Sequence, residues 1–294
     1  LNLSKLLYEM CVNPWDTRTS AGGSSGGAGS ALAACVCWLA QGSDRGGSLR
    51  LPAHFNGVIG FRTSPGVVMQ QKQCTPRRYA LHSMNGPMAR TVLDSALFLD
   101  TMTQRIDSQN LPMPGWEKYP ENPYEQIPCQ SWQEIAQRGQ VEGRNETTSY
   151  SIAFSSLKCD AVRSEVRKIC YRAAAKLSGT GSIEDLLEPF NVLLASNVYS
   201  ILRSEGFLKT YGHMDSDDGT AQLTIAQKAR IKPETRWNSK YCERLSSFGF
   251  DETDGELLAV KKAYGDADCL NDQVNAFFEK YDLLCAPVSH NVAF

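Results

Sequence analysis

Two glycine-rich segments, each built around a serine, constrain this chain more than any other feature of its sequence. The first is Gly22-Gly23-Ser24-Ser25-Gly26-Gly27, and the second is Gly42-Ser43-Asp44-Arg45-Gly46-Gly47-Ser48. Glycine beside serine permits backbone turns that other residues avoid, and it lets backbone N–H groups point together at an anion. We therefore expect two tightly turned loops, each presenting a serine hydroxyl.

The composition is that of an ordinary globular chain. It has 294 residues, of which 42% are hydrophobic and 21% charged, and its formal net charge is −2. This balance suits one large core or two domains. Charge near neutrality without a Lys/Arg cluster predicts no nucleic-acid partner. The longest apolar run, 31–40, is shorter than the roughly 20 residues of a spanning helix, so we expect it in the core and predict no membrane span.

The ten cysteines and four histidines are scattered along the chain. Cys-x-x-Cys pairs and the spacing typical of zinc sites are both absent. The sequence therefore predicts no metal and no other cofactor. A chain of this length does not need a disulfide framework, so we expect free thiols in a reducing compartment and a cytoplasmic protein.

The first hundred residues predict alternating helices and strands. Helices are expected at 26–36 and 48–55, and short strands at 37–40 and 58–61. The segment 13–21 is a poor strand candidate because it contains Pro14 and many polar residues. This alternation predicts an α/β fold, with a sheet layered between helices.

Further along the chain, Thr91 and Asp94 have the spacing of a capping box, which predicts a helix start. Residues 104–148 lack clear periodicity and are interpreted as a surface excursion or insertion. A strand is expected at 150–154 and helices at 186–207 and 257–278. Between them, Asp160 should cap a helix whose apolar stripe is Val162, Val166, Ile169, Ala173 and Leu177.

Several other segments accompany the two glycine-serine segments along the chain. They are Asn13-Pro14-Trp15-Asp16, Ser48-Leu49-Arg50, Pro52-Ala53-His54-Phe55, Gly57-Val58-Ile59-Gly60-Phe61-Arg62, Ser64-Pro65-Gly66, Asn85-Gly86-Pro87-Met88-Ala89-Arg90 and Tyr281-Asp282-Leu283-Leu284-Cys285-Ala286-Pro287. Together they resemble the amidase signature family. The resemblance implies a single domain over 1–294 with a mixed central β-sheet sandwiched between layers of helices, and an insertion at 104–149. It also predicts that the chain is a fragment, incomplete at both ends.

The resemblance implies that this family's chemistry is amide hydrolysis through an acyl-enzyme. It places the nucleophile at Ser48 and a bridging serine at Ser24, after a cis Gly23–Ser24 peptide bond. The residues themselves agree, because consecutive N–H groups from Arg45 to Ser48 at a helix entrance would stabilise an oxyanion. The simpler alternative is a glycine-rich turn with Ser48 as a helix cap and a flexible loop around Ser24.

The remaining candidate residues surround these two serines. Ser43 is expected to hydrogen-bond within the loop, and Asp44 to hold the loop through backbone contacts. Arg45, Gly46 and Gly47 complete the predicted oxyanion loop. Substrate contacts are predicted for Gly22, Gly23, Ser25 and Arg50, with a structural salt bridge as the alternative for Arg50.

A rival interpretation makes Ser25 the centre of a Gly-x-Ser-x-Gly nucleophile elbow. That motif requires a strand directly before it, which the segment 13–21 does not predict. A phosphate-binding loop is disfavoured because no Gly-Lys-Ser/Thr follows.

The family's catalytic group is a Ser–Ser–Lys triad, and its lysine lies far upstream of the cis-serine. Lys5 is the one lysine before Ser24 in this chain, and it is too near to be that counterpart. His54 is a poor substitute because it is expected about two helical turns beyond Ser48.

Two hypotheses follow for the function. The first is an amidase that hydrolyses a small-molecule amide; the second is a partner-dependent A-type amidotransferase component or a non-catalytic relative. The segment Arg77–Met84 does not match the Tyr-Gly-Leu-like stretch expected of the amidotransferase component. The oligomeric state, a homodimer included, and the substrate stay open.

Overall fold

The second serine-bearing segment begins in a small antiparallel sheet with helices on both faces. In the computed structural model the strands are β3 (Leu39–Asp44), β5 (Met84–Ala89) and β4 (Ile59–Gly60), in the order β3-β5-β4. The structure describes residues 11–64, 67–68, 83–103, 131–142, 149–156, 162–179, 181–211 and 258–291.

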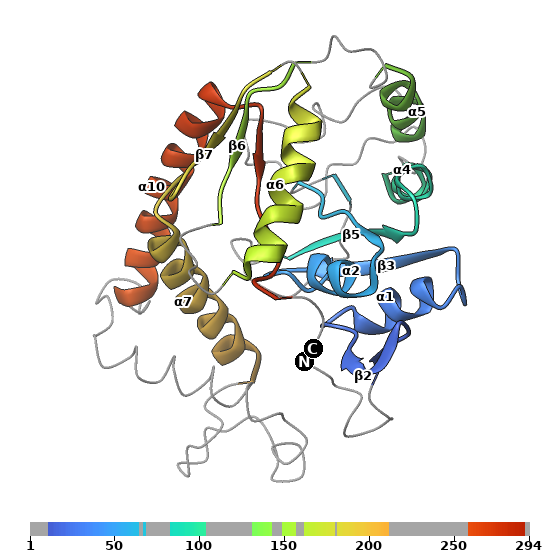
Figure 1. Ribbon diagram of the computed structural model, residues 1–294. Coiled ribbons are helices and arrows are strands. Elements are labelled where there is room, and N and C mark those ends of the chain that lie inside the picture. The colour runs from blue at the N-terminus through green and yellow to red at the C-terminus, as the bar shows by residue number, and fades with distance from the viewer. Residues whose placement is uncertain are drawn as a thin grey trace, which may run out of the picture. The chain divides into compact units, whose positions relative to one another are not determined.

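Alternation along β3 and β5 separates the two faces of this sheet. On one face lie Gly42 and Met88, which meet Leu49 where α1 (Gly26–Ala33) and α2 (Arg50–Asn56) pack. Helix α4 (Val92–Thr103) lies on the other face (Figure 1). The buried side chains Leu32, Leu49, Ala53 and Met88 form the core between the sheet and the first two helices.

A short hairpin precedes these elements. Strands β1 (Val12–Asn13) and β2 (Asp16–Ser20) pair antiparallel to form a separate two-stranded sheet. Our expectation that residues 13–21 would not form a strand was therefore wrong. A two-residue turn at Pro14 and Trp15 lets the proline lie between the strands, where it removes no ladder hydrogen bond.

Two further predictions in this region need correction. The run 31–40 was expected in the core, but α1 ends at Ala33, and Val36 and Trp38 are both 78% exposed. The strand expected at 37–40 instead begins at Leu39 and continues through Gly42, Ser43 and Asp44. The helices predicted at 26–36 and 48–55 and the strand at 58–61 are confirmed, with shorter bounds.

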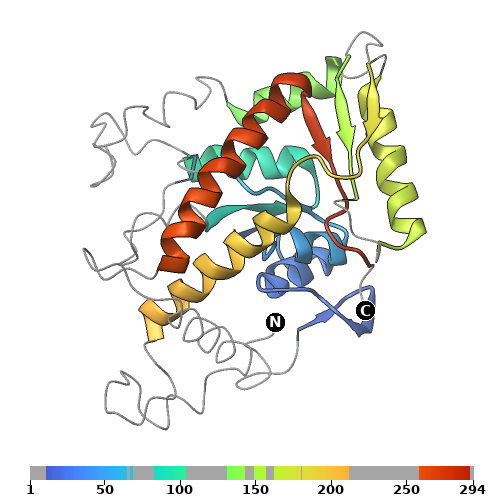
Figure 2. The same ribbon diagram turned by 90° about the vertical axis from the view of Figure 1, so that its left-hand side faces the viewer.

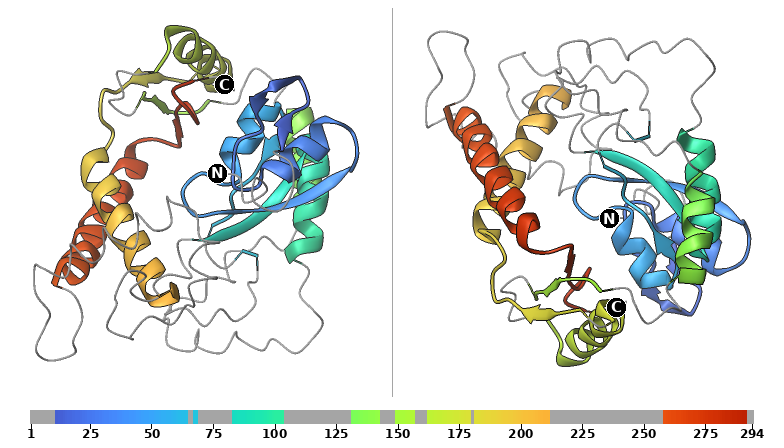
Figure 3. Two further views of the ribbon diagram at one scale, coloured as in Figure 1. Left: turned by 90° about the horizontal axis from the view of Figure 1, so that it is seen from below. Right: turned by 90° about the horizontal axis from the view of Figure 1, so that it is seen from above.

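A second sheet is parallel and contains β6 (Ile152–Phe154), β7 (Ile183–Asp185) and β8 (Leu283–Cys285) in the order β7-β6-β8. The end of helix α10 (Leu258–Lys280) packs on this sheet, where Phe277 and Tyr281 contact Ala153, and helix α7 (Val192–Tyr211) lies beside α10 (Figure 2). They lie side by side in both views of Figure 3. The predicted strand at 150–154 and helix at 257–278 are confirmed, and the late strand near 281–287 is β8. The helix expected at 186–207 is α7, which begins only at Val192.

Helix α6 (Ser164–Ser178) connects β6 to β7, as a parallel pair requires. Its predicted stripe is only partly right, because Ile169 is 65% and Leu177 49% exposed. The face that is buried runs through Val166, Ala174 and Ser178 at intervals of four or eight residues. Asp160, its predicted cap, lies outside the described residues.

Residues 104–148, in which the sequence showed no clear periodicity, contain α5 (Trp132–Glu142). This helix begins where Asp100 of α4 accepts hydrogen bonds from Ser131 Oγ at 2.6 Å and from the Trp132 N–H at 2.6 Å. The cap therefore comes from a distant residue, which local periodicity does not reveal. The capping box at Thr91 is confirmed, because Thr91 Oγ1 lies 2.7 Å from Asp94 Oδ2 and accepts the Asp94 N–H at 3.1 Å.

The chain divides into two compact units. The first contains 1–148, 161–170 and 287–294, and the second 149–160 and 171–286. Parallel and antiparallel pairing thus both occur, in separate sheets of the described residues, and the fold class is α/β as predicted. Among the described helices, none combines the length and apolar character needed to cross a membrane.

Candidate active site

The segment around Ser24 links β2 to α1 through a non-proline cis peptide bond between Gly23 and Ser24. This is the bond for which the resemblance implied that geometry. Gly22 has φ +75°, and a Cβ there would lie 3.1 Å from Pro52 Cα. Glycine is therefore required at Gly22 both by the backbone conformation and by the approach of α2.

The segment around Ser48 links β3 to α2. Strand β3 ends at Asp44, Gly47 turns the chain with φ +107°, and α2 begins at Arg50. The two serine segments meet directly, because the Ser25 N–H donates to the Ser48 carbonyl oxygen at 2.9 Å. The fold thus brings together the two segments that carry Ser24 and Ser48.

Ser25 makes a second link between these segments. Its hydroxyl accepts the Ser43 N–H at 3.2 Å and lies 3.5 Å from the Ser43 carbonyl oxygen. Ser25 was predicted to contact substrate, and Ser43 to hydrogen-bond within the loop. The structure uses the Ser25 side chain to hold the end of β3, so these contacts give it a positioning role.

Asp44 organises the loop that carries Ser48. Its side chain is fully buried, and it accepts N–H bonds from Gly47 at 2.8 Å, Leu49 at 3.4 Å and Arg50 at 3.3 Å. Three amides around one carboxylate fix the backbone on both sides of Ser48. The predicted role of Asp44, holding the loop through backbone contacts, agrees with this geometry.

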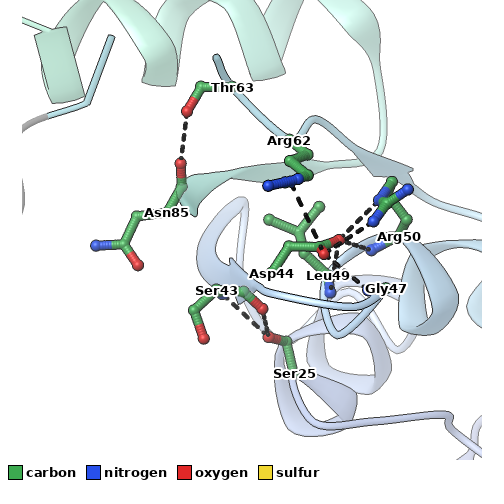
Figure 4. A network of polar contacts seen from close by, with 9 residues as sticks. All are labelled: Ser25, Ser43, Asp44, Gly47, Leu49, Arg50, Arg62, Thr63 and Asn85. Carbon is green, nitrogen blue, oxygen red and sulfur yellow. Dashed lines mark hydrogen bonds and ion pairs between the residues drawn. The ribbon is translucent and has the colours of Figure 1, made fainter. Parts of the chain in front are cut away.

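Two arginines approach the same carboxylate from different directions (Figure 4). Arg50 binds it in a bidentate manner, with Nε 2.8 Å from Oδ2 and an Nη 2.9 Å from Oδ1. Arg62 Nε lies 4.0 Å from Oδ1. Because the Arg50 guanidinium is already paired with Asp44, a structural salt bridge accounts for Arg50 better than the predicted contact with substrate does.

The charge on Asp44 is maintained by these partners. Burial on its own would raise the pKa of the carboxyl group, but the hydrogen bonds from the Arg50 side chain and the Gly47 N–H outweigh it and lower the pKa from 3.8 to about 2. Burial lowers the pKa of Arg62, an effect that the Asp44 charge opposes. A buried carboxylate between two guanidinium groups stays ionised throughout the neutral range.

The predicted oxyanion donors are only partly available. The Gly47 N–H is already committed to Asp44. The N–H groups of Gly46 and Ser48 donate no hydrogen bond within the part of the chain that the structure describes. These two amides flank Gly47, the positive-φ residue of the loop.

The proton acceptor is not identified by the structure. Lys5 lies outside the described residues. His54 is on α2, and its Nε2 is 3.1 Å from the Asn291 carbonyl oxygen. The residues that the structure describes bring together no cluster of three His, Cys, Asp or Glu side chains that could hold a metal ion.

The nucleophile-elbow interpretation requires a strand directly before Ser25, whereas β2 ends at Ser20 and four residues lie between them. Ser25 is the N-cap residue of α1, and its φ of −81° is negative. The elbow motif instead needs a sharp, strained turn at its serine. Its strand is also part of a two-stranded hairpin, so the elbow interpretation remains disfavoured.

Sequence reasoning missed Arg62, Asn56 and the roles of Asn13 and Trp15. Arg62, Asn13 and Trp15 lie in segments quoted for the resemblance and Asn56 lies directly between two of them, yet none carried an assigned role. Their partners lie elsewhere in the chain, as with Asn13 Nδ2 and the Phe55 carbonyl oxygen. Only the pairing of distant segments could have revealed these contacts.

Comparison with known proteins identifies the family. The family model described as Amidase matches residues 2–294. The chain therefore belongs to the amidase signature family. Its α/β fold is shared with a bacterial aryl acylamidase of that family, at a TM-score of 0.68 and 19% identity, over 96% of this chain and 52% of that one.

Two curated relatives are similar over shorter stretches. An indoleacetamide hydrolase from Bradyrhizobium diazoefficiens is 45% identical over 103 residues, which cover 34% of this chain and 20% of the relative. The A component of a glutamyl-tRNA(Gln) amidotransferase from Microcystis aeruginosa is 40% identical over 117 residues, covering 38% and 24%. The matched parts are thus a fifth to a quarter of these relatives' length.

Proposed function

We propose that the protein containing this chain hydrolyses the C–N bond of a carboxamide through an acyl-enzyme on Ser48. The observation that carries the proposal is the contact between the two serine segments, in which the Ser25 N–H binds the Ser48 carbonyl oxygen beside the cis Gly23–Ser24 peptide. This contact supports the proposal because Ser24 and Ser48 then lie on adjoining loops, as a proton relay between them would require.

In the proposed first step, Ser48 Oγ attacks the amide carbonyl carbon and its proton passes to Ser24. The negative charge on the carbonyl oxygen is met by the Gly46 and Ser48 N–H groups. When the tetrahedral intermediate collapses, the C–N bond breaks and the amine leaves with a proton returned through Ser24. The acceptor beyond Ser24 is the lysine that the family resemblance implies.

In the second step, water attacks the acyl-enzyme and Ser48 Oγ is the leaving group. The products are the carboxylic acid and free Ser48, and the same relay carries the protons. Neither step consumes a redox equivalent, so the proposed reaction needs only the amide and water.

The test is a pair of serine variants in the full-length protein. Ser48→Ala should lower amide turnover by roughly 10³-fold or more and abolish labelling by a fluorophosphonate probe. Ser200→Ala is the matched control, because its hydroxyl bonds to the Ser196 carbonyl oxygen within α7. Turnover and labelling that survive in Ser48→Ala would refute the assignment of the nucleophile.

A second candidate is a partner-dependent amidotransferase component, which the similarity to the Microcystis aeruginosa protein favours. The same catalytic serines would then release ammonia for transfer to another acceptor. Assaying ammonia release by the purified protein alone separates the two candidates. Sustained release without a partner supports the hydrolase, and activity only after addition of partner proteins supports the amidotransferase.

A further inference from the structure

We propose that Asn13, Trp15 and Asn56 form a clamp on α2 that positions the Ser24 loop against the Ser48 loop. We call these three residues the α2 clamp. They touch no reacting atom in the proposed mechanism, so they are positioning residues. The expected effect of the clamp on the reaction rate rests on the proposed function, but the contacts that form the clamp do not depend on that function.

The clamp holds the end of α2 that is remote from Ser48. The last carbonyl groups of a helix have no partner within the helix. Here Asn13 Nδ2 donates to the Phe55 carbonyl oxygen at 2.7 Å, and Trp15 Nε1 donates to the Asn56 carbonyl oxygen at 2.9 Å. The β1–β2 turn therefore caps the helix, while Gly57, with φ +68°, turns the chain away.

Asn56 extends this contact to the Ser24 loop. Its side chain is fully buried, and Nδ2 donates to the carbonyl oxygens of Ala21 and Pro52, each at 2.8 Å. These two acceptors fix the orientation of the Asn56 amide, because a flipped amide would place Oδ1 against two carbonyl oxygens and repel them. A single side chain thus joins α2 to the residue directly before Gly22.

The oxygen of this amide adds an energetic cost. Asn56 Oδ1 is buried and has no hydrogen-bond partner within the described part of the chain. A buried unpaired acceptor costs about 1–3 kcal/mol. An apolar residue would avoid that cost, so the bonds to Ala21 and Pro52 are the distinctive contribution of asparagine at this position.

The region around Asn56 has little room to adjust. A Cβ at Gly29 of α1 would lie 2.8 Å from Asn56 Nδ2 and 3.1 Å from the Pro52 carbonyl oxygen. Helices α1 and α2 therefore approach each other closely. Ser24 lies between two fixed points, which are the Asn56–Ala21 bond on one side and the Ser25–Ser48 bond on the other.

The short length of α2 makes the clamp relevant to Ser48. The helix has 7 residues and begins two residues after Ser48, so a shift at its end moves its beginning as well. Misplacing reacting groups by about 1 Å can cost roughly 100-fold in rate. The clamp should therefore affect kcat more than KM.

Trp15→Phe is the cleanest test of the clamp. The Trp15 ring is 74% exposed, so the substitution removes the bond to Asn56 with little loss of packing. We expect kcat for a simple amide, and the rate of fluorophosphonate labelling, to fall about tenfold with KM within about twofold of wild type. Trp38→Phe is the matched control, because Trp38 is 78% exposed in the same unit and should leave both rates unchanged.

Asn56→Ala should have the larger effect, with a fall in kcat of roughly 100-fold at a temperature where circular dichroism shows a folded protein. Asn56→Ser, which keeps a donor, should recover part of it. If the Asn56 variants do not fold, Trp15→Phe decides alone. Wild-type kcat and labelling in Trp15→Phe would overturn the inference.

Hydrogen exchange separates failure of the clamp from failure of the proposed function. In Trp15→Phe, amide exchange should rise in peptides that contain Gly22–Ser25 and Ser48–Leu51, and it should not rise in Trp38→Phe. This measurement needs no turnover. A wild-type protein that neither hydrolyses amides nor labels at Ser48 would refute the proposed function, whereas unchanged exchange in Trp15→Phe would refute the clamp.

Discussion

Both units of this chain have apolar cores, but they differ in the polar side chains that they bury. In the first unit the buried set includes Asn13, Asp44 and Asn56, each held by hydrogen bonds to backbone groups. In the second unit the centre of the sheet is apolar, with Ile152, Ala153 and Phe154 fully buried. Phe154 meets Tyr171 edge to face at 5.3 Å between ring centroids.

This difference shows where precise geometry is needed. Apolar contacts are non-directional, so a core like that of the second unit tolerates small changes of shape. A buried polar group is stable only when its partners are in place, and each partner also fixes a segment of backbone. The first unit uses such groups around its two serine loops, where position has chemical consequences.

The strongest test of this comparison is Asp44→Asn. The variant keeps the shape of the side chain but removes its charge, leaving Arg50 and Arg62 without their buried counter-ion. We expect the free energy of unfolding to fall by about 3–5 kcal/mol, measured by urea denaturation. Asp16→Asn is the control, because Asp16 pairs with Arg18 in an exposed ion pair. If Asp44→Asn lowers the free energy of unfolding no more than Asp16→Asn does, burial does not make the Asp44 ion pairs more important for stability.

The second test is acid titration of the first unit. Asp44 has a pKa of about 2 in the folded protein and 3.8 as its ordinary value. Because the pKa is lowered on folding, the stabilisation is complete above about pH 4 and is lost as the pH falls toward 2. We expect about 2–3 kcal/mol from this group. The loss between pH 4 and 2 should be smaller in Asp44→Asn than in wild type.

The third test removes a hydrogen bond that faces solvent. Thr91→Ala deletes the capping box of α4 and should cost about 0.5–2 kcal/mol. The cost is below that of Asp44→Asn because water can replace the lost bond to the Asp94 N–H. Thermal unfolding measures it, and Thr101→Ala, within the same helix, controls for loss of a threonine. A loss of stability larger than that of Asp44→Asn would contradict the idea that buried polar groups matter more than exposed ones.

The smallest effect is expected for Ile152→Val in the second unit. The side chain is fully buried, but the change removes one methylene group from an apolar core. We expect a loss of about 0.5–1.5 kcal/mol and unchanged fluorophosphonate labelling of Ser48. Labelling that drops in this variant while the protein stays folded would show that the two units are less independent than their cores suggest.

Local sequence features predicted the fold where the decisive interactions are local. The Thr91–Asp94 capping box spans three residues, and the helix that follows it was correctly placed. The segment 13–21 was misjudged because β2 is stabilised by pairing with β1 rather than by its own composition. The stripe of α6 was misassigned because apolar spacing alone allowed two faces, and packing selected the one through Val166 and Ala174.

The candidate site divides in the same way. The two serine segments and the loop-holding role of Asp44 were predictable, since glycine, serine and aspartate at that spacing have few alternative uses. The commitment of the Gly47 N–H to Asp44 and the approach of Arg62 were not. The first contact depends on how the loop after β3 folds onto Asp44, and the second depends on the strand pairing that brings Arg62 close to Asp44.

Asp100 has a consequence for how this family can vary. By accepting bonds from Ser131 and Trp132, it ties α4 to the start of α5, the two helices that residues 104–130 connect in the sequence. When the two ends of a segment are held together, the segment can lengthen or shorten at little entropic cost, since each doubling of a loop adds only about 0.6 kcal/mol. The length and sequence of this segment could therefore change during evolution without disturbing the antiparallel sheet or the two serine loops.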